Sequence, residues 1–420
     1  MTAPSVSPKT EPSKERLKRS LRRWYDCNKG DIMNVYADNA ATTKLCEAAI
    51  KEMLPHMMEI YGNPSSLHSE GQKAAMALRD ARERIATKLG CQAEEIIFTS
   101  GGSEADNLAI LGVAKSGAKH GKKHIISTAF EHDAVLHTLE ALQADGFEVT
   151  LLPVHSDGLV VPEEVTAAIR LDTCLVTVMY ANNEIGTVQP ISKIGRICRE
   201  VGVPFHTDAV QAVGHLPIHV KEQSIDMLSF SAHKFHGPKG VGALYVRNGI
   251  SIQPLIHGGE QERGRRAGTE NIPAIMGMAA ALEESCDGVE KNSAHLTRLR
   301  DRLVNGLSHI PHSTSNGSML HRLPGNVNFS FAGIEGESLV LLLDKLGICA
   351  STGSACNSSS MEPSHVLLAI GQPPELANVS LRLTLCAENT QAEIDYLIHA
   401  VSEAVLKLRR KSFGECSIHL

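Results

Sequence analysis

The stretch Ile96-Ile-Phe-Thr-Ser-Gly-Gly-Ser-Glu-Ala-Asp-Asn-Leu-Ala-Ile110 joins an apolar run to a glycine turn and then to a helical pattern that begins near Ser103. Free backbone amides and a hydroxyl at a helix start can hold a phosphate. The stretch lacks the GxxxxGK(S/T) pattern of a nucleoside-triphosphate loop, and taken alone it fits an ordinary serine-capped helix better. It predicts a strand, turn and helix with a candidate phosphate site.

Short apolar runs alternate with longer helical patterns on both sides of this stretch, from Val35 onward. The predicted strands are Glu95–Thr99, Lys123–Ser127, Glu148–Leu152, Cys174–Met179, Pro204–His206, Met227–Phe230 and Val241–Val246. Runs that are apolar throughout indicate strands buried on both faces of a mostly parallel sheet. Helical patterns such as Ala74–Leu89 and Val135–Ala144 supply the crossovers, so the predicted fold class is α/β.

The pattern changes after Gly268, where a long helical stretch covers Ala274–Ile310. The last helix is predicted from a Thr390–Glu393 capping box and one apolar face. That face consists of Ile394, Leu397, Ile398, Val401, Val405 and Leu408. We therefore expect a large domain over 33–271, a smaller α+β domain over 272–420, and the first residues after 33 packed on the smaller one.

Composition restricts the partners and the compartment. The chain has 420 residues with 41 basic and 47 acidic side chains, a net charge of −6, which gives no basic surface for nucleic acid or membrane. Ten cysteines without CxxC pairs indicate a reducing compartment, and no metal-site spacing is present. Residues 1–32 form a basic leader, expected to be a disordered tail; we predict a cytoplasmic protein, with organelle import as the alternative.

Two further segments place reactive side chains after predicted strands. Asp208 follows the run that starts at Val203, where its carboxylate could pair with a pyridinium nitrogen or simply cap a helix. Lys234 lies in Ser231-Ala-His-Lys234, where a buried amine could form a Schiff base; a salt-bridged loop lysine is the plainer interpretation. The candidate phosphate turn, Asp208 and Lys234 follow one another along the chain, and this order favours a pyridoxal phosphate (PLP) enzyme.

The segment from Val35 to about Leu408 resembles the NifS/IscS-type cysteine desulfurases, which are fold-type I PLP enzymes. The resemblance rests on many motifs rather than one. They are Asp38-Asn-Ala-Ala-Thr-Thr, Gly62-Asn-Pro-Ser-Ser-Leu-His, Thr99-Ser-Gly-Gly-Ser-Glu-Ala-Asp-Asn, Glu131-His132, Ala181-Asn-Asn-Glu-Ile-Gly-Thr, His206-Thr-Asp-Ala-Val-Gln, Ser231–Lys234, Gln261-Glu-Arg-Gly-Arg-Arg-Ala-Gly-Thr-Glu-Asn and Thr352-Gly-Ser-Ala-Cys.

The resemblance implies a role for each matching residue. Lys234 would bind PLP covalently, Asp208 would contact the pyridine nitrogen, and Gln211 would face the ring hydroxyl. His132 would lie over the ring with Asn183 near the substrate side, and Arg382 would grip the substrate carboxylate. The expected phosphate cup comprises Gly102, Ser103, Ser231 and His233, together with Thr269 from the second subunit of a homodimer.

The resemblance also implies which reaction occurs, through Cys356 in Ser351-Thr-Gly-Ser-Ala-Cys-Asn-Ser-Ser-Ser. Its small neighbours predict a loop that can carry the thiol to the substrate. In the family this thiol takes sulfur from L-cysteine, giving L-alanine and a persulfide for an acceptor such as an iron–sulfur scaffold protein. Taken without the resemblance, Cys356 is interpreted more simply as a surface cysteine with no catalytic role.

The chain departs from the family after Arg382, where Cys386-Ala387 replaces a Gly-Arg pair and removes a basic residue near the site. The C-terminal sequence from Glu415 also differs, which leaves the sulfur acceptor open. Two alternatives remain at this point. One is selenocysteine lyase or another PLP lyase or transaminase on the same fold, and the other is a non-catalytic scaffold protein.

Overall fold

The computed structural model describes residues 33–352 and 363–415. Its largest element is a sheet of seven strands in the order β2-β8-β7-β6-β5-β3-β4. Their bounds are β2 Ile96–Thr99, β3 His124–Thr128, β4 Glu148–Leu152, β5 Thr173–Thr177, β6 Phe205–Asp208, β7 Met227–Ser231 and β8 Gly242–Val246. Strand β8 runs antiparallel to both neighbours and the other pairs are parallel. The predicted α/β class and all seven predicted strands are confirmed; β4 has the predicted bounds, and the ends of the other six are shifted.

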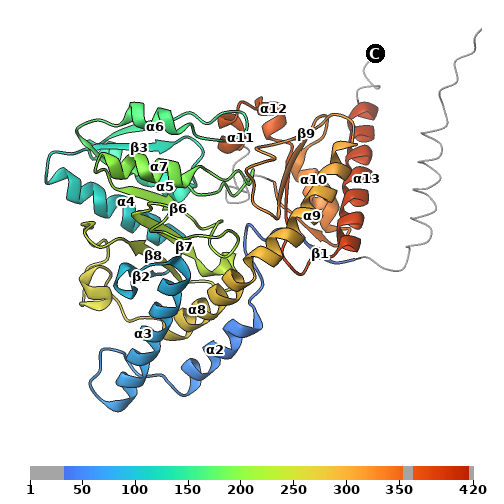
Figure 1. Cartoon of the computed structure of the whole chain (residues 1–420). Helices are drawn as coiled ribbons and strands as arrows, with labels where there is room; N and C mark the ends of the chain where they lie inside the picture. The colour runs from blue at the N-terminus through green and yellow to red at the C-terminus, as the bar shows by residue number, and fades with distance from the viewer. Residues whose placement is uncertain (1–32, 353–362, 416–420) are drawn as a thin grey trace, which may run out of the picture.

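Helices cover both faces of this sheet (Figure 1). They are α2 Glu47–Met58, α3 Ser69–Leu89, α4 Gly102–Ala118, α5 Asp133–Ala144, α6 Pro162–Ala168, α7 Ile191–Glu200 and α8 Ile272–Asp287. Side chains alternate along β2, so Ile97 packs with α4 and α5, whereas Ile96 and Phe98 pack in the cluster that includes α3 and α8. The predicted burial on both faces is confirmed for the inner strands but is wrong for β4, which lies at the edge of the sheet and leaves Leu151 48% exposed.

The smaller, C-terminal core contains a three-stranded antiparallel sheet in the order β12-β10-β9. Its strands are β9 Ser313–Ser315, β10 Asn326–Phe331 and β12 Ser380–Thr384, and its helices are α9 Val289–Ser308, α10 Gly336–Asp344 and α13 Gln391–Glu415. Strand β1, Val35–Tyr36, pairs with β11, Ile348–Cys349, so the first described residues join this C-terminal core. Short helices α11 His365–Ala369 and α12 Pro374–Ala377 pack instead against the larger core.

The last helix begins as the sequence predicts. The side chain of Glu393 accepts from the Thr390 amide at 2.6 Å, and the Thr390 hydroxyl accepts from the Glu393 amide at 3.3 Å. Of the predicted apolar face, Ile394, Leu397, Val401 and Val405 are fully buried, and the other two members are partly buried.

The helical stretch predicted over Ala274–Ile310 is confirmed, and the structure divides it into two helices, α8 and α9, that meet at Gly288. Glycine is a poor helix former, and the two halves are buried in different places. Helix α8 packs in the larger core and α9 in the smaller one, so the apolar clusters divide near Gly288. The domain limits at 271 and 272 remain a prediction.

Among the described helices, none is both long and apolar enough to cross a membrane. The predicted leader, residues 1–32, lies outside the described residues, as does Cys356.

Candidate active site

The carboxyl ends of β2, β6 and β7 open onto one cavity of about 290 Å³. That volume is near the lower end, roughly 300 Å³, of the range for small-molecule sites. Its lining comprises Ala40, Ala41, Gly102, Ser103, Asp106, His132, Met179, Ala181, Asn183, Asp208, Val210, Gln211, Ser231, His233, Lys234 and Arg382. Of the predicted site residues that the structure describes, the topology therefore brings together all except Thr269.

Lys234 lies in the short 3-10 turn Ala232–Lys234 directly after β7. Its Nζ donates to the carbonyls of Ala40 at 2.5 Å and Ala41 at 2.8 Å. Sequence reasoning gave these two carbonyls no role, although their segment was among the matching motifs. They hold the amine at the cavity wall in the part of the site where a Schiff base would form.

The glycine turn forms a cradle that a side chain would fill. A Cβ on Gly102 would lie 2.7 Å from Val210, and one on Gly101 would contact the Ser231 hydroxyl at 3.6 Å. Helix α4 begins at Gly102, so its first amides face this space. Burial and the neighbouring Lys234 lower the pKa of His233 to about 4, which keeps its imidazole neutral near pH 7. The turn can therefore bind phosphate through amides and hydroxyls.

Asp208 is buried at the end of β6, and one of its carboxylate oxygens accepts from the Val210 amide at 2.9 Å. Burial raises its pKa, whereas His132, Lys234 and this hydrogen bond lower it. His132 caps α5 by accepting from the Ala134 amide at 3.1 Å, which fixes the imidazole at the cavity. Gln211 donates to the Ala40 carbonyl at 3.0 Å.

Arg382 is a buried guanidinium on β12 that reaches the same cavity from the smaller sheet. It donates to Asp38 at 3.0 Å and to the Asn183 carbonyl at 3.2 Å. Its Nε is buried and has no hydrogen-bond partner among the described residues. Two of the five N–H groups make these bonds, so further N–H groups on Nη1 and Nη2 remain for an anionic ligand. The contact with Asp38 was not predicted, although Asp38 opens a matching motif.

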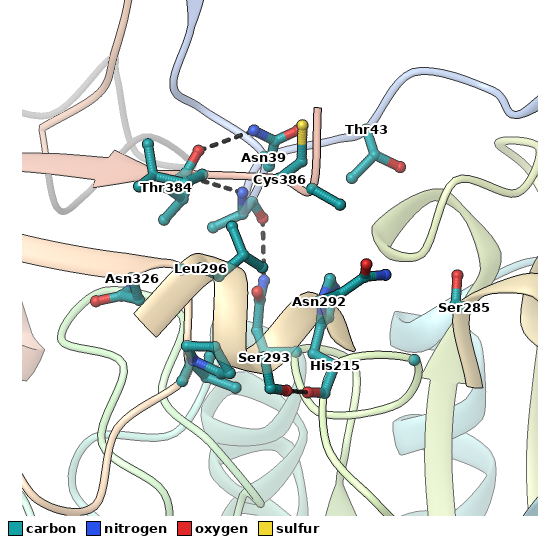
Figure 2. A pocket seen from close by; sticks show the side chains of 18 of the residues that line it. Asn39, Thr43, His215, Ser285, Asn292, Ser293, Leu296, Asn326, Thr384 and Cys386 are labelled. Carbon is teal, nitrogen blue, oxygen red and sulfur yellow. Dashed lines mark hydrogen bonds between the residues drawn. The ribbon is translucent and has the colours of Figure 1, made fainter. Parts of the chain in front are cut away.

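Thr269 is exposed and does not line the cavity, as is expected of a residue that acts on another subunit. Cys386 and Ala387 line a second pocket that shares Ala40 and Gln211 with the first. Figure 2 shows Cys386 and Thr384 on one side of it and His215 on the other. Cys386 and Ala387, where the sequence departs from the family, therefore line this second pocket and are not part of the lining of the Lys234 cavity.

These features fit pyridoxal phosphate: an amine for its aldehyde, a glycine cradle for its phosphate and a buried carboxylate for its ring nitrogen. Fold and site together define a fold-type I PLP-dependent protein.

Comparison with known proteins gives the family. The aminotransferase class-V family model matches residues 35–397. "Cysteine desulfurase IscS" of Methanosarcina thermophila is 53% identical over 378 residues, which cover 90% of this chain and 93% of that protein. The chain belongs to the aminotransferase class-V family and its cofactor is pyridoxal phosphate.

Two solved structures resemble this one. A structure titled "NIFS-LIKE PROTEIN" superposes with a TM-score of 0.85 at 40% identity, covering 90% of this chain and all of the other. "SspA in complex with cysteine" superposes with a TM-score of 0.75 at 39% identity, covering 85% and 100%.

Proposed function

We propose that this protein is a cysteine desulfurase, which moves the sulfur of L-cysteine onto Cys356. The observation that carries the proposal is that the Lys234 amine and the buried Arg382 guanidinium line the same cavity. The chain is also 53% identical to a protein named cysteine desulfurase. An amine site and a carboxylate site in one pocket fit an α-amino acid.

Bound PLP acts as an electron sink for the substrate's carbon atoms. Arg382 binds and orients the substrate carboxylate with the N–H groups that Asp38 and Asn183 leave unused. The amine of Lys234, which the carbonyls of Ala40 and Ala41 hold in position, would take and return the Cα proton of the substrate. The Asp208 carboxylate would favour the protonated form of the pyridine nitrogen.

The Cys356 thiolate supplies the nucleophile in this proposal. A sulfur–sulfur bond forms between Cys356 and the substrate sulfur, and the substrate Cβ–S bond breaks. The electron pair of that bond stays with the carbon, which then takes up a proton. The products are L-alanine and a Cys356 persulfide, and together they contain every atom of cysteine and the thiol.

The acceptor of this sulfur is proposed to be an iron–sulfur scaffold protein or a thiolation enzyme. The identity to "Cysteine desulfurase IscS" supports this class of partner. We retain the cytoplasm as the proposed compartment, with leader-directed import as the alternative.

The proposed assembly is a homodimer. Helix α2 and the loop after it carry large apolar side chains on the surface, beyond what a monomer normally exposes. These are Ile50, Leu54, Met57, Met58, Tyr61 and Leu67. A second copy covering this surface would bury them. We propose that Thr269 then completes the partner's phosphate cup.

The test uses the purified holoenzyme with L-cysteine and, separately, L-selenocysteine. We expect a yellow protein that makes alanine from cysteine, and a Lys234→Ala variant that lacks the visible band and the activity. Alanine from selenocysteine with none from cysteine would replace the proposal with selenocysteine lyase. A wild type that stays colourless with added PLP and makes no alanine would support the scaffold alternative.

A further inference from the structure

Three carboxyl groups interact electrostatically at the cavity: Asp106 and Asp208, which line it, and Glu131, which does not. All three are buried, with Asp106 only 1% exposed. Asp106 lies on α4 one turn after Ser103 and lines the cavity itself. The motifs contained Asp106, but neither the resemblance nor the proposed mechanism gives it a task.

Asp106 ends a chain of buried hydrogen bonds that crosses three strands. Thr177 on β5 bonds His206 Nδ1 at 2.8 Å, and His206 Nε2 bonds the Ser229 hydroxyl at 2.9 Å. The Ser229 side chain in turn bonds the Asp106 carboxyl. The other oxygen, Asp106 Oδ1, has no hydrogen-bond partner among the described residues.

His206 does not compensate a negative charge on Asp106. Its Nε2 lies 3.7 Å from Asp106 Oδ1, within ion-pair range if the ring were protonated. Both ring nitrogens, however, are already bonded to hydroxyls, and burial lowers the pKa of His206 to about 3. The imidazole is therefore neutral, and the 3.7 Å contact is not a salt bridge.

The surroundings of Asp106 disfavour its ionisation. Burial and then the negative charges of Asp208 and Glu131 raise the pKa of Asp106 well above its usual range, and the hydrogen bond from Ser229 offsets only part of this rise. Burial likewise raises the pKa of Glu131 to about 8. Asp208 differs, because the Val210 amide donates to it and because His132 and Lys234 both lower its pKa. Like charges this close do not all ionise, and Asp208 is the best stabilised.

We propose that Asp106 is a positioning residue, held as a neutral carboxylic acid at the end of the Thr177–His206–Ser229 chain, which leaves Asp208 as the one ionised carboxyl beneath the cofactor. The inference deepens the proposed function and rests on it only in that PLP occupies the cavity. A second negative charge at Asp106 would compete with Asp208 for the ring's proton and positive charge. The neutral acid removes that competition while it satisfies the Ser229 hydroxyl.

The test compares Asp106→Asn with Asp208→Asn in the holoenzyme. Asparagine copies a neutral aspartic acid in shape and charge. We expect Asp106→Asn to shift the pH midpoint of the cofactor's visible band by less than about 0.3 unit and its PLP dissociation constant by less than about twofold. Asp208→Asn should weaken PLP binding about tenfold or more. Asp145→Asn, at an exposed aspartate, is the matched control for a lost surface charge.

Infrared spectroscopy supplies the readout that a merely structural role would not move. Wild-type holoenzyme labelled with carboxyl-¹³C aspartate should show an isotope-shifted band of a protonated carboxyl, and Asp106→Asn should lose it. If Asp106→Asn fails to fold, the absence of that band from the labelled wild type still rules out a neutral Asp106. Absence of that band, or a midpoint shift of about one unit or more in Asp106→Asn, would overturn the proposal. If alanine were still made from cysteine, the desulfurase function would survive that result.

Discussion

Arg382 is held in position by the protein before any substrate arrives. Asp38 and the Asn183 carbonyl occupy part of its fork, and the buried Nε has no partner among the described residues. A side chain fixed in this way loses little conformational freedom when it binds a carboxylate. Substrate recognition therefore depends on the shape of the guanidinium as well as its charge.

Replacing Arg382 with lysine should raise KM for L-cysteine about tenfold or more, because a point charge cannot keep both protein contacts and also bind the carboxylate. The change in kcat should be smaller, since the amine and the thiol are untouched. Steady-state alanine formation measures both constants. Arg196→Lys, at an exposed arginine, is the matched control. An unchanged KM would remove Arg382 from the substrate site.

Glu131 makes stability depend on pH. Its folded pKa of about 8 lies above the ordinary value of 4.5 because the carboxyl is buried. The folded state thus holds the proton more tightly than the unfolded chain, and the stabilisation is complete below the unfolded pKa and lost as pH rises through about 8. In urea titrations from about pH 5 to about pH 9, Glu131→Gln should remove this fall. The exposed Glu140→Gln should retain it, and an unchanged slope in Glu131→Gln would contradict the assignment.

The sequence alone predicts those site residues that lie directly after a strand and carry a reactive side chain. Asp208 and Lys234 follow β6 and β7 directly, so the parallel topology brings them to one edge. Asp38 and Asp106 were missed as functional residues because their importance comes from contacts with Arg382 and Ser229, 344 and 123 positions away in the chain. Sequence periodicity does not predict contacts between residues that are so far apart in the chain.

At the scale of elements, the turn Gln261–Gly264 is the most constrained segment near the site. Glu262 and Arg263 have left-handed backbone angles, with φ of 47° and 59°, which cost about 1–3 kcal/mol each for non-glycine residues. Glu262 offsets this cost through a buried two-point pair with Arg82 at 2.6 and 2.7 Å and by accepting from the Phe98 amide. The turn also leads to Arg266, which pairs with Glu104 on α4 beside the phosphate cradle.

Glu262→Gln should lower the free energy of unfolding by about 3–5 kcal/mol, because it leaves the Arg82 charge buried without a counter-charge. Urea denaturation followed by circular dichroism measures the change. Glu163→Gln, at an exposed glutamate on α6, should change it by less than about 0.5 kcal/mol. A near-neutral Glu262→Gln would mean that the turn is held by other contacts.

The sequence predicts helices and strands that have a periodic apolar pattern or a capping motif. It does not predict where one helix ends and the next begins within a continuous pattern. The capping box of α13 is local, so its sequence predicts its start. The break at Gly288 depends on α8 and α9 belonging to different cores, which is a property of packing. Both helices carry continuous helical patterns, so the sequence alone joins them.

At the scale of the whole molecule, the active site depends on both cores. Lys234 and Asp208 come from the large sheet, whereas Arg382 comes from β12 of the smaller one. Residues that begin in β1 connect the two, because Ala40 and Ala41 bind Lys234 while Val35 packs in the smaller core. Substrate binding between the two cores can thus draw them together.

The proposed dimer predicts the effect of charges on α2. Leu54 and Met57 are 50% and 60% exposed, so arginine at both positions should leave the monomer folded but disrupt the interface. Sedimentation velocity should show a dimer for the wild type and a monomer for the double variant, with weaker PLP retention if Thr269 acts across the interface. Leu171→Arg, at a leucine that is 99% exposed, should stay dimeric. A double variant that remains a dimer would place the interface elsewhere.

The most direct test of the account is single-turnover chemistry on the holoenzyme with L-cysteine, comparing wild type and Cys356→Ser. Alanine is quantified, and mass spectrometry follows the peptide that contains Cys356. We predict one alanine for each sulfur atom added to that peptide in the wild type, and a yellow Cys356→Ser that makes neither product. Release of sulfide and alanine by Cys356→Ser at the wild-type rate would contradict the account.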